Sequence, residues 1–71
     1  MNTAEIVRVA RESRGLTRKQ LSDKSGVHVT TIWNIERAKS SPSMDNMLKL
    51  MEAMDYTIVF NPRYKGGYMD E

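Results

Sequence analysis

The chain has 71 residues, no cysteine, one histidine and a formal net charge of +2. This length allows one small domain, and the cysteine and histidine counts exclude a disulfide framework or a metal cluster built on those residues. No apolar run approaches the roughly 18 residues that cross a bilayer, and the N-terminus has no signal-like apolar segment. We therefore expect an intracellular, cytoplasmic domain without metal, cofactor or membrane contact.

Positive charge is concentrated in the middle of the chain. Residues 15–41 contain five basic and two acidic side chains, whereas residues 42–71 contain three basic and five acidic ones. A surface that binds a polyanion requires such a local excess. Solvated charged faces are also common, so this distribution carries weight only together with other features.

The first helix is predicted from Thr3 to Arg14. Thr3 is a suitable N-cap, and Gly15 ends the helix because glycine accepts a left-handed conformation without a Cβ clash. Three apolar side chains recur on one helical face: Ile6, Val7 and Ala10.

A second, short helix is predicted between Thr17 and Gly26. Thr17 and Gln20 have the spacing of a capping box, Leu21 is the inward anchor, and Gly26 closes the helix. So short a helix depends on tertiary contacts for its stability.

The third predicted helix begins around His28, which reads as an N-cap, and continues to Arg37. Its apolar side is supplied by Val27, Ile32 and Ile35. The remaining positions of this helix point elsewhere: Val29, Thr30, Trp33, Asn34 and Arg37.

The fourth predicted helix starts at Ser43, and Asp55 takes the turn conformation at its end. Apolar residues repeat along it at helical spacing. Because flexible thioethers fill irregular gaps, its methionines are expected in the core and not in a ligand site. The repeat consists of Met44, Met47, Leu48, Met51 and Met54.

The helical spacing of apolar residues ends after the fourth helix. Residues Tyr56–Phe60 predict a β-strand, bounded by Asp55 and by Asn61-Pro62. A lone strand leaves its backbone groups unpaired, and the chain has no second strand candidate. The same strand of a second copy is the simplest partner, with residues 56–61 as the dimerisation strand. Its pairing side chains are Tyr56, Ile58 and Phe60. Residues 62–71 are expected to form a flexible tail.

The two middle helices, separated by a glycine-centred turn, have the helix-turn-helix pattern. Around them the sequence resembles the Cro/repressor family of helix-turn-helix domains, also called the XRE family, over roughly residues 5–54. The residues that carry the resemblance are Gly15-Leu16-Thr17, Leu21, Gly26-Val27, Ile32, Ile35-Glu36-Arg37, Lys39 and Pro42-Ser43.

By this resemblance the third helix is the recognition helix, and its base-reading positions are Val29, Thr30, Trp33 and Asn34. The amide of Asn34 suits an adenine edge, and Val29 suits a thymine methyl group. Trp33 either stacks on sugar and backbone at the groove wall or covers the neighbouring helix. Arg37 is either a phosphate contact or a solvated surface residue. Three further positions match those that usually touch phosphate: Arg18, His28 and Lys39.

Arg11 and Glu36 match a family pair that forms a buried ion bridge between the first and third helices, so their expected role is structural. The sequence departs from the family at Ala38, where glycine commonly ends the recognition helix, and at the strand that replaces a fifth helix. Such a C-terminal strand resembles a subset of the family, including some antitoxins, that dimerises by strand pairing.

The sequence thus predicts a mainly α, four-helix, lambda-repressor-like domain over residues 1–61 with one C-terminal strand that pairs in a dimer. The predicted function is a transcriptional regulator, most simply a repressor, that binds double-stranded DNA at a palindromic operator as a homodimer. The alternative is an antitoxin that binds a partner toxin as well as its operator. No nucleophile–base pair, metal cluster or phosphate loop is recognisable, so we expect no catalytic residues.

Overall fold

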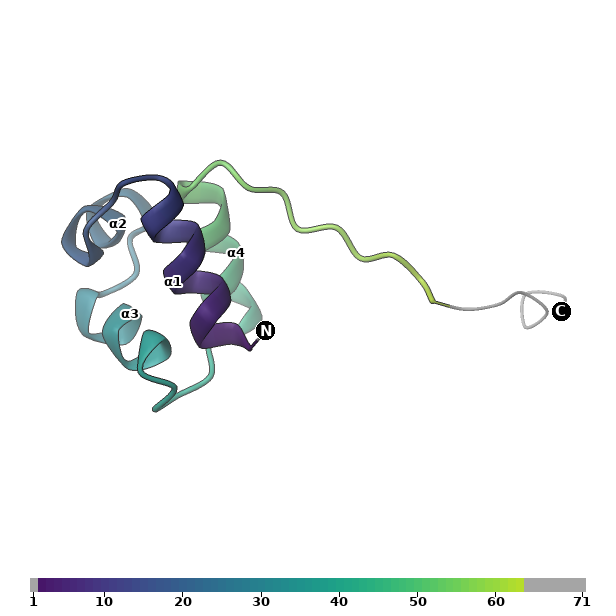
Figure 1. The fold of residues 1–71 in the computed structure, drawn as a ribbon, viewed down its shortest axis with the longest axis horizontal. Coiled ribbons are helices and arrows are strands. Elements are labelled where there is room, and N and C mark those ends of the chain that lie inside the picture. Colours follow the sequence, from purple (N-terminus) through teal and green to yellow (C-terminus); the bar gives the residue numbers. More distant parts are fainter. Residues whose placement is uncertain (1, 64–71) are drawn as a thin grey trace, which may run out of the picture.

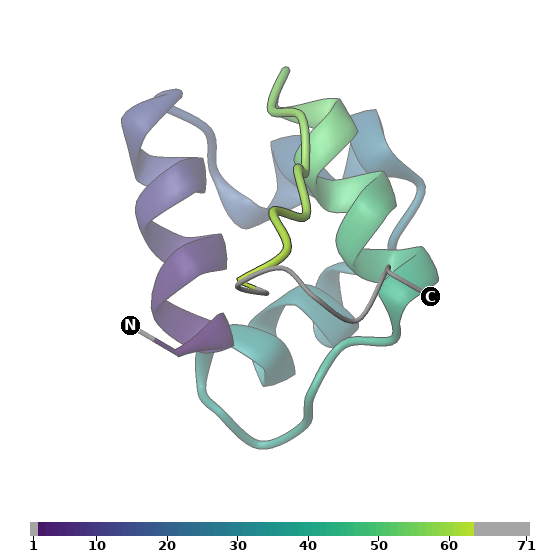
Figure 2. The same cartoon turned by 90° about the vertical axis from the view of Figure 1, so that its right-hand side faces the viewer.

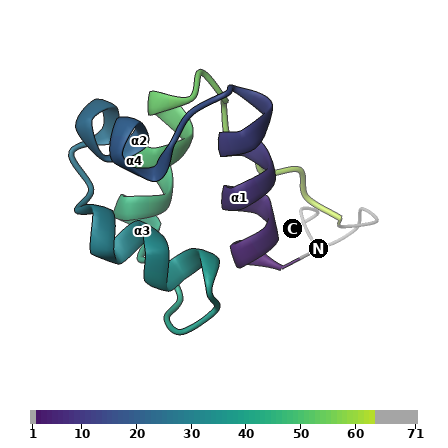
Figure 3. The same ribbon diagram turned by 60° about the vertical axis from the view of Figure 1, so that its left-hand side comes forward.

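The computed structural model describes residues 2–63, and these form a mainly α domain with four helices (Figure 1). Helix α1 packs against α3, and α2 packs against both α3 and α4. Figure 3 shows α2 and α3 as neighbouring helices joined by a short turn. The helices are α1 (Thr3–Ser13), α2 (Arg18–Ser25), α3 (Val29–Glu36) and α4 (Met44–Ala53). The predicted four-helix architecture is confirmed.

Side chains cap each of the four helices at its N-terminus. Thr17 and Gln20 form the predicted capping box, and His28 and Ser43 cap α3 and α4 as expected. The prediction for α1 was wrong by one residue. Asn2 is its cap, because Asn2 Oδ1 accepts from the Glu5 amide at 2.9 Å and Glu5 Oε1 accepts from the Asn2 amide at 3.2 Å.

Three helices end in the same way, with a residue of positive φ whose amide and the next amide bond back to the helix. At the end of α3, the Ala38 amide donates to the Ile35 carbonyl at 3.0 Å and the Lys39 amide donates to the Asn34 carbonyl at 2.9 Å. The left-handed residue is Gly15 after α1, Ala38 after α3 and Asp55 after α4. The turn conformation predicted for Asp55 is confirmed.

One apolar core joins all four helices. Its buried side chains are Val7, Ala10, Leu21, Val27, Ile32, Ile35, Leu50, Met51 and Met54. The predicted inner face of α4 is partly wrong. Leu50, which was not among the predicted apolar positions, is fully buried, whereas Met44 and Leu48 are exposed. Ile6 was also expected in the core, yet it is 36% exposed, because it lines an open groove between α1, Met51 of α4 and the chain that follows α4.

A buried ion pair ties α1 to α3. Arg11 Nε lies 2.7 Å from Glu36 Oε2, and Arg11 Nη2 donates to Glu36 Oε1 at 2.9 Å. The third nitrogen, Nη1, donates to the Leu16 carbonyl at 2.8 Å. The hydrogen bond to Glu36 raises the pKa of Arg11 although burial opposes it, so the guanidinium stays charged. The pair therefore holds two full charges in a site with little water.

After α4 the chain runs away from the helices as an extended segment, residues 56–63 (Figure 1). Seen from the side to which it points, the segment lies between α1 and α4 (Figure 2). No strand is present among residues 2–63, so the strand predicted for Tyr56–Phe60 is not formed by the single chain. The reason is physical: a strand needs a hydrogen-bonded neighbour, and the described residues offer none.

Of the tail predicted over residues 62–71, only Pro62 and Arg63 are described, and residues 64–71 lie outside the described part. Among the described helices none is long and apolar enough to cross a membrane.

Breaking the buried pair should destabilise the fold strongly. Glu36→Gln removes the buried counter-charge of the Arg11 guanidinium and leaves only the exposed Glu12 carboxylate, 4.0 Å away, so we expect the free energy of unfolding to fall by roughly 3–5 kcal/mol. A urea titration followed by helical circular dichroism measures it. Asp23→Asn is the control, because it breaks the exposed Lys19–Asp23 pair and should change stability by less than about 1 kcal/mol. Equal effects of the two variants would contradict the structural role of Glu36.

Ala38 has φ +60°, a conformation in which a Cβ is unfavourable by roughly 1–2 kcal/mol. Ala38→Gly should therefore raise the free energy of unfolding by about 1 kcal/mol. The reverse change at the equivalent position, Gly15→Ala, should lower it by a similar amount, because an added Cβ there meets no atom within 4 Å and only the backbone conformation is affected. Thermal unfolding of both variants provides the measurement, and a destabilised Ala38→Gly protein would refute the argument.

Candidate nucleic-acid interface

The turn between α2 and α3 sets the two helices at a fixed angle. Gly26 ends α2 with φ +80°, and Val27 enters the core directly after it. Leu21 of α2 and Ile32 of α3 are both fully buried. Because the inner faces of the two helices are locked in one core, the opposite face of α3 has a defined orientation and is turned toward solvent.

The four residues assigned to base reading lie together on that outer side of α3. Thr30 and Trp33 are exposed, whereas Val29 and Asn34 are half-buried. Within the described part of the chain, the side-chain amide of Asn34 makes no hydrogen bond to another protein group, so its donor and acceptor are available. The surface thus offers an amide, a hydroxyl and apolar groups side by side, which are the groups that distinguish base edges in a major groove.

The cationic side chain of Arg37 lies over one face of the Trp33 ring. The guanidinium carbon of Arg37 lies 4.3 Å from the ring centroid, and the Trp33 side chain is 46% exposed. This cation–π contact holds both side chains against the same helix. It places a positive charge beside the base-reading positions, where either a phosphate or solvent can face it.

A hollow of about 270 Å³ lies between the start of α2 and the outer face of α3. It is lined by Arg18, Val29, Thr30 and Trp33. Arg18 Nε donates to Glu36 Oε1 at 3.0 Å, and the Arg18 side chain is 40% exposed. Glu36 therefore bonds to two arginines. The sequence carries no signal for this second bond, because α2 and the end of α3 are brought together only by the fold.

The other basic candidates surround the ends of α3. His28 is exposed, and its Nδ1 accepts from the Thr30 amide at 3.1 Å, so Nε2 is the protonated nitrogen of the neutral ring and can donate outward. Arg37 and Lys39 are exposed at the other end. Backbone amide and cationic groups at helix ends are typical phosphate contacts.

The residues predicted for dimerisation have unequal surroundings. Ile58 packs against the core, and Tyr56 lies near α1 with the Arg14 guanidinium 4.5 Å from its ring centroid. Phe60 is 73% exposed and Val59 is 67% exposed. The apolar surface of this segment is thus only partly covered by its own chain. No group of three or more residues suited to hold a metal ion occurs within residues 2–63.

Comparison with known proteins agrees with this geometry. The sequence model of a family described as helix-turn-helix matches residues 7–61, which include all of α2, α3 and α4. An uncharacterized HTH-type transcriptional regulator of Sinorhizobium fredii (strain NBRC 101917 / NGR234) is 32% identical over 57 residues, which are 80% of this chain and 29% of that protein. The chain thus corresponds to less than a third of the length of that relative.

Proposed function

Since this chain belongs to the helix-turn-helix family, we propose that it is a DNA-binding transcriptional regulator that reads an operator with α3 and acts most simply as a repressor. The supporting observation is the outer face of α3, where Thr30 and Trp33 are exposed and the Asn34 side-chain amide has no hydrogen-bond partner among residues 2–63, on a helix fixed by the core. A rigid, solvent-facing set of this kind can dock against base edges without first rearranging.

Sequence preference comes from the middle of α3. The Asn34 amide can bond to both N6 and N7 of adenine, and Thr30 lies one turn earlier on the same face. The methyl groups of Val29, in the wall of the hollow, suit a thymine methyl group. Trp33, with Arg37 over its ring, suits the sugar and backbone at the groove wall better than a base edge.

Most of the affinity comes from phosphate contacts, and it therefore falls as salt rises. His28 and Lys39 lie at opposite ends of α3 and can contact the two sides of one groove. Arg37 adds a charge near the groove wall. Arg18 contributes less to phosphate binding, because its Nε is already bonded to Glu36 and only its terminal nitrogens can face a phosphate.

The regulator acts as a homodimer on a palindromic operator, with the segment 56–61 pairing antiparallel to its symmetry mate. The exposed apolar side chains of this segment and of α4 support an association. A two-fold axis through the paired segments places the recognition helices in successive major grooves, about 34 Å apart.

A second candidate is an antitoxin that binds a toxin protein as well as its own operator. The observation that favours it is the same exposed apolar surface, which a different protein could cover instead of a second copy: Met44, Leu48, Val59 and Phe60. The two functions are separated by testing whether the purified chain alone shifts its own upstream DNA, and whether a toxin-like protein is encoded next to it.

The assignment of Asn34 is tested by Asn34→Ala. Loss of a bidentate amide contact should weaken binding to the cognate duplex by roughly 1–3 kcal/mol and relax one base position, while binding to scrambled DNA stays unchanged. Fluorescence anisotropy with both duplexes measures the ratio. Asn46→Ala on α4 is the matched control and should leave both affinities unchanged. A cognate-to-scrambled ratio equal to that of the parent would remove Asn34 from the base-reading set.

The dimer is tested by Ile58→Asp. Two carboxylates brought together at the symmetry axis repel each other and lose the burial of Ile58, so sedimentation velocity should show monomers. Ser41→Asp adds the same charge in an exposed loop and should sediment as the parent does. Circular dichroism verifies that both variants keep the four helices, and a folded Ile58→Asp protein that remains dimeric would exclude pairing through this segment.

A further inference from the structure

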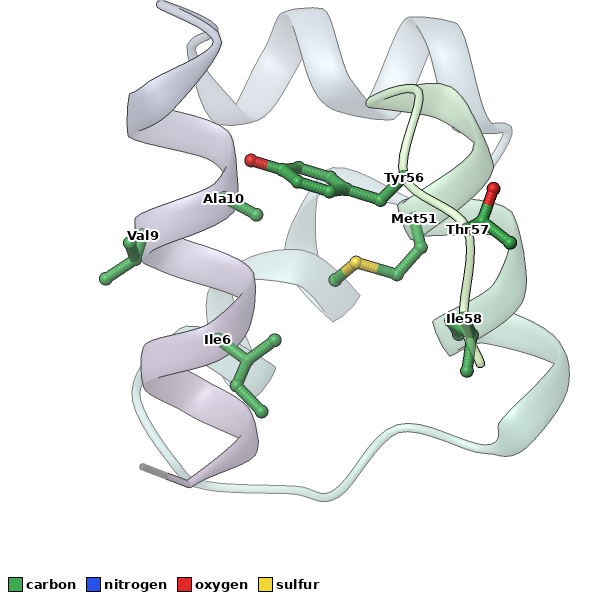
Figure 4. A pocket seen from close by; sticks show the side chains of 7 residues that line it. All are labelled: Ile6, Val9, Ala10, Met51, Tyr56, Thr57 and Ile58. Carbon is green, nitrogen blue, oxygen red and sulfur yellow. The ribbon is translucent and has the colours of Figure 1, made fainter. Parts of the chain in front are cut away.

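An apolar groove of about 250 Å³ lies between α1 and the segment that follows α4 (Figure 4). In this view Ile6 and Ala10 point from α1 toward the segment, and Tyr56 reaches across toward α1. Met51 lies between the two sides. The complete lining is Ile6, Val9, Ala10, Met51, Tyr56, Thr57 and Ile58. Only Tyr56 and Thr57 carry polar side-chain atoms, so the groove suits an apolar occupant.

The segment itself carries a side chain of that kind. Side chains alternate between the two faces of an extended chain, so Tyr56, Ile58 and Phe60 share one face. Tyr56 and Ile58 on this face line the groove, and Thr57 between them lines it as well. Beyond these residues the segment leaves the helices (Figure 1), and Phe60 is 73% exposed. By this alternation Phe60 belongs to the same face as Tyr56 and Ile58, yet most of its surface is left uncovered by the described residues of its own chain.

We propose that the groove receives Phe60 of the partner subunit when two copies associate, and that this exchange, in addition to strand pairing, holds the dimer together. The inference rests on the proposed homodimer and specifies its interface. In an antiparallel pair centred on Ile58, position 60 of one copy lies opposite position 56 of the other. Residues opposite each other project on the same face with Cβ atoms about 4.5–5.5 Å apart.

The register therefore brings Phe60 of the partner subunit beside Tyr56, at the groove. The two-fold axis makes the exchange reciprocal, so each copy inserts one ring and receives one. Arg14 already occupies one face of the Tyr56 ring, which leaves its edge and opposite face for an aromatic neighbour. A second copy is favoured over an unrelated protein because the donor and the groove are present on the same chain at matching distances from Ile58.

Phe60 is the one phenylalanine of the chain, so 4-fluorophenylalanine labelling gives a single ¹⁹F resonance for it. We expect this resonance to move with protein concentration in step with the monomer–dimer equilibrium measured by sedimentation. Ile6→Arg, which places a charge in the groove from a part-exposed position, should keep the resonance at its monomer position. A resonance that does not respond to dimerisation would overturn the proposal.

A matched pair of variants measures the contribution to association. Phe60→Ala should raise the dimer dissociation constant at least roughly tenfold, because two buried rings are lost per dimer. Val59→Ala removes an equally exposed neighbour on the opposite face and should change it less than about threefold. Both residues are exposed in the single chain, so circular dichroism should show unchanged folding. Equal effects of the two variants would overturn the proposal.

The remaining outcomes separate this proposal from the function on which it rests. A parent dimer in which Phe60 stays solvent-exposed overturns the ring exchange alone and leaves the paired-strand regulator intact. A parent that is monomeric at all concentrations yet binds its operator overturns both the dimer and the exchange. If the ¹⁹F resonance of Phe60 is already shifted in the monomer, Phe60 packs within its own chain, and the exchange is overturned.

Discussion

The position of α3 in the fold depends on one buried carboxylate. Glu36, the last residue of α3, is bonded to Arg11 of α1 and to Arg18 at the start of α2. A buried charge is tolerated only where hydrogen bonds and opposite charges surround it, so any movement of α3 that lengthens these bonds is strongly unfavourable. The apolar core fixes the distance between the helices, and this network fixes the direction and rotation of α3.

That constraint bears directly on the outer face of α3. Asn34 is two residues before Glu36, and Trp33 and Arg37 stack on each other next to it. A small rotation of the helix would turn the Asn34 amide away from a base edge. The buried network and the proposed base readout are therefore linked. The buried charge of Glu36, which is unfavourable without its two arginine partners, keeps the outer face of α3 in a single orientation.

The four-helix core is too small to cover all the apolar side chains of the extended segment. The four helices enclose a single core, and the side chains of Val59 and Phe60 extend past it. Small domains often complete their burial by association. In the proposed dimer the same event covers these side chains and sets the spacing of the two recognition helices, so stability and operator geometry are coupled.

What the sequence alone determined is local. The capping box of Thr17, the stop at Gly26 and the helix-turn-helix spacing were predictable, because each depends on residues within a few positions of one another. Where the local pattern was wrong, the folded chain decided: Asn2 caps α1 in place of the predicted Thr3, and packing of α4 against α2 buries Leu50, which the predicted repeat did not contain. The second bond of Glu36 and the absence of the strand from the described residues had no local signal, since both depend on groups that only the folded chain, or a second chain, brings within reach.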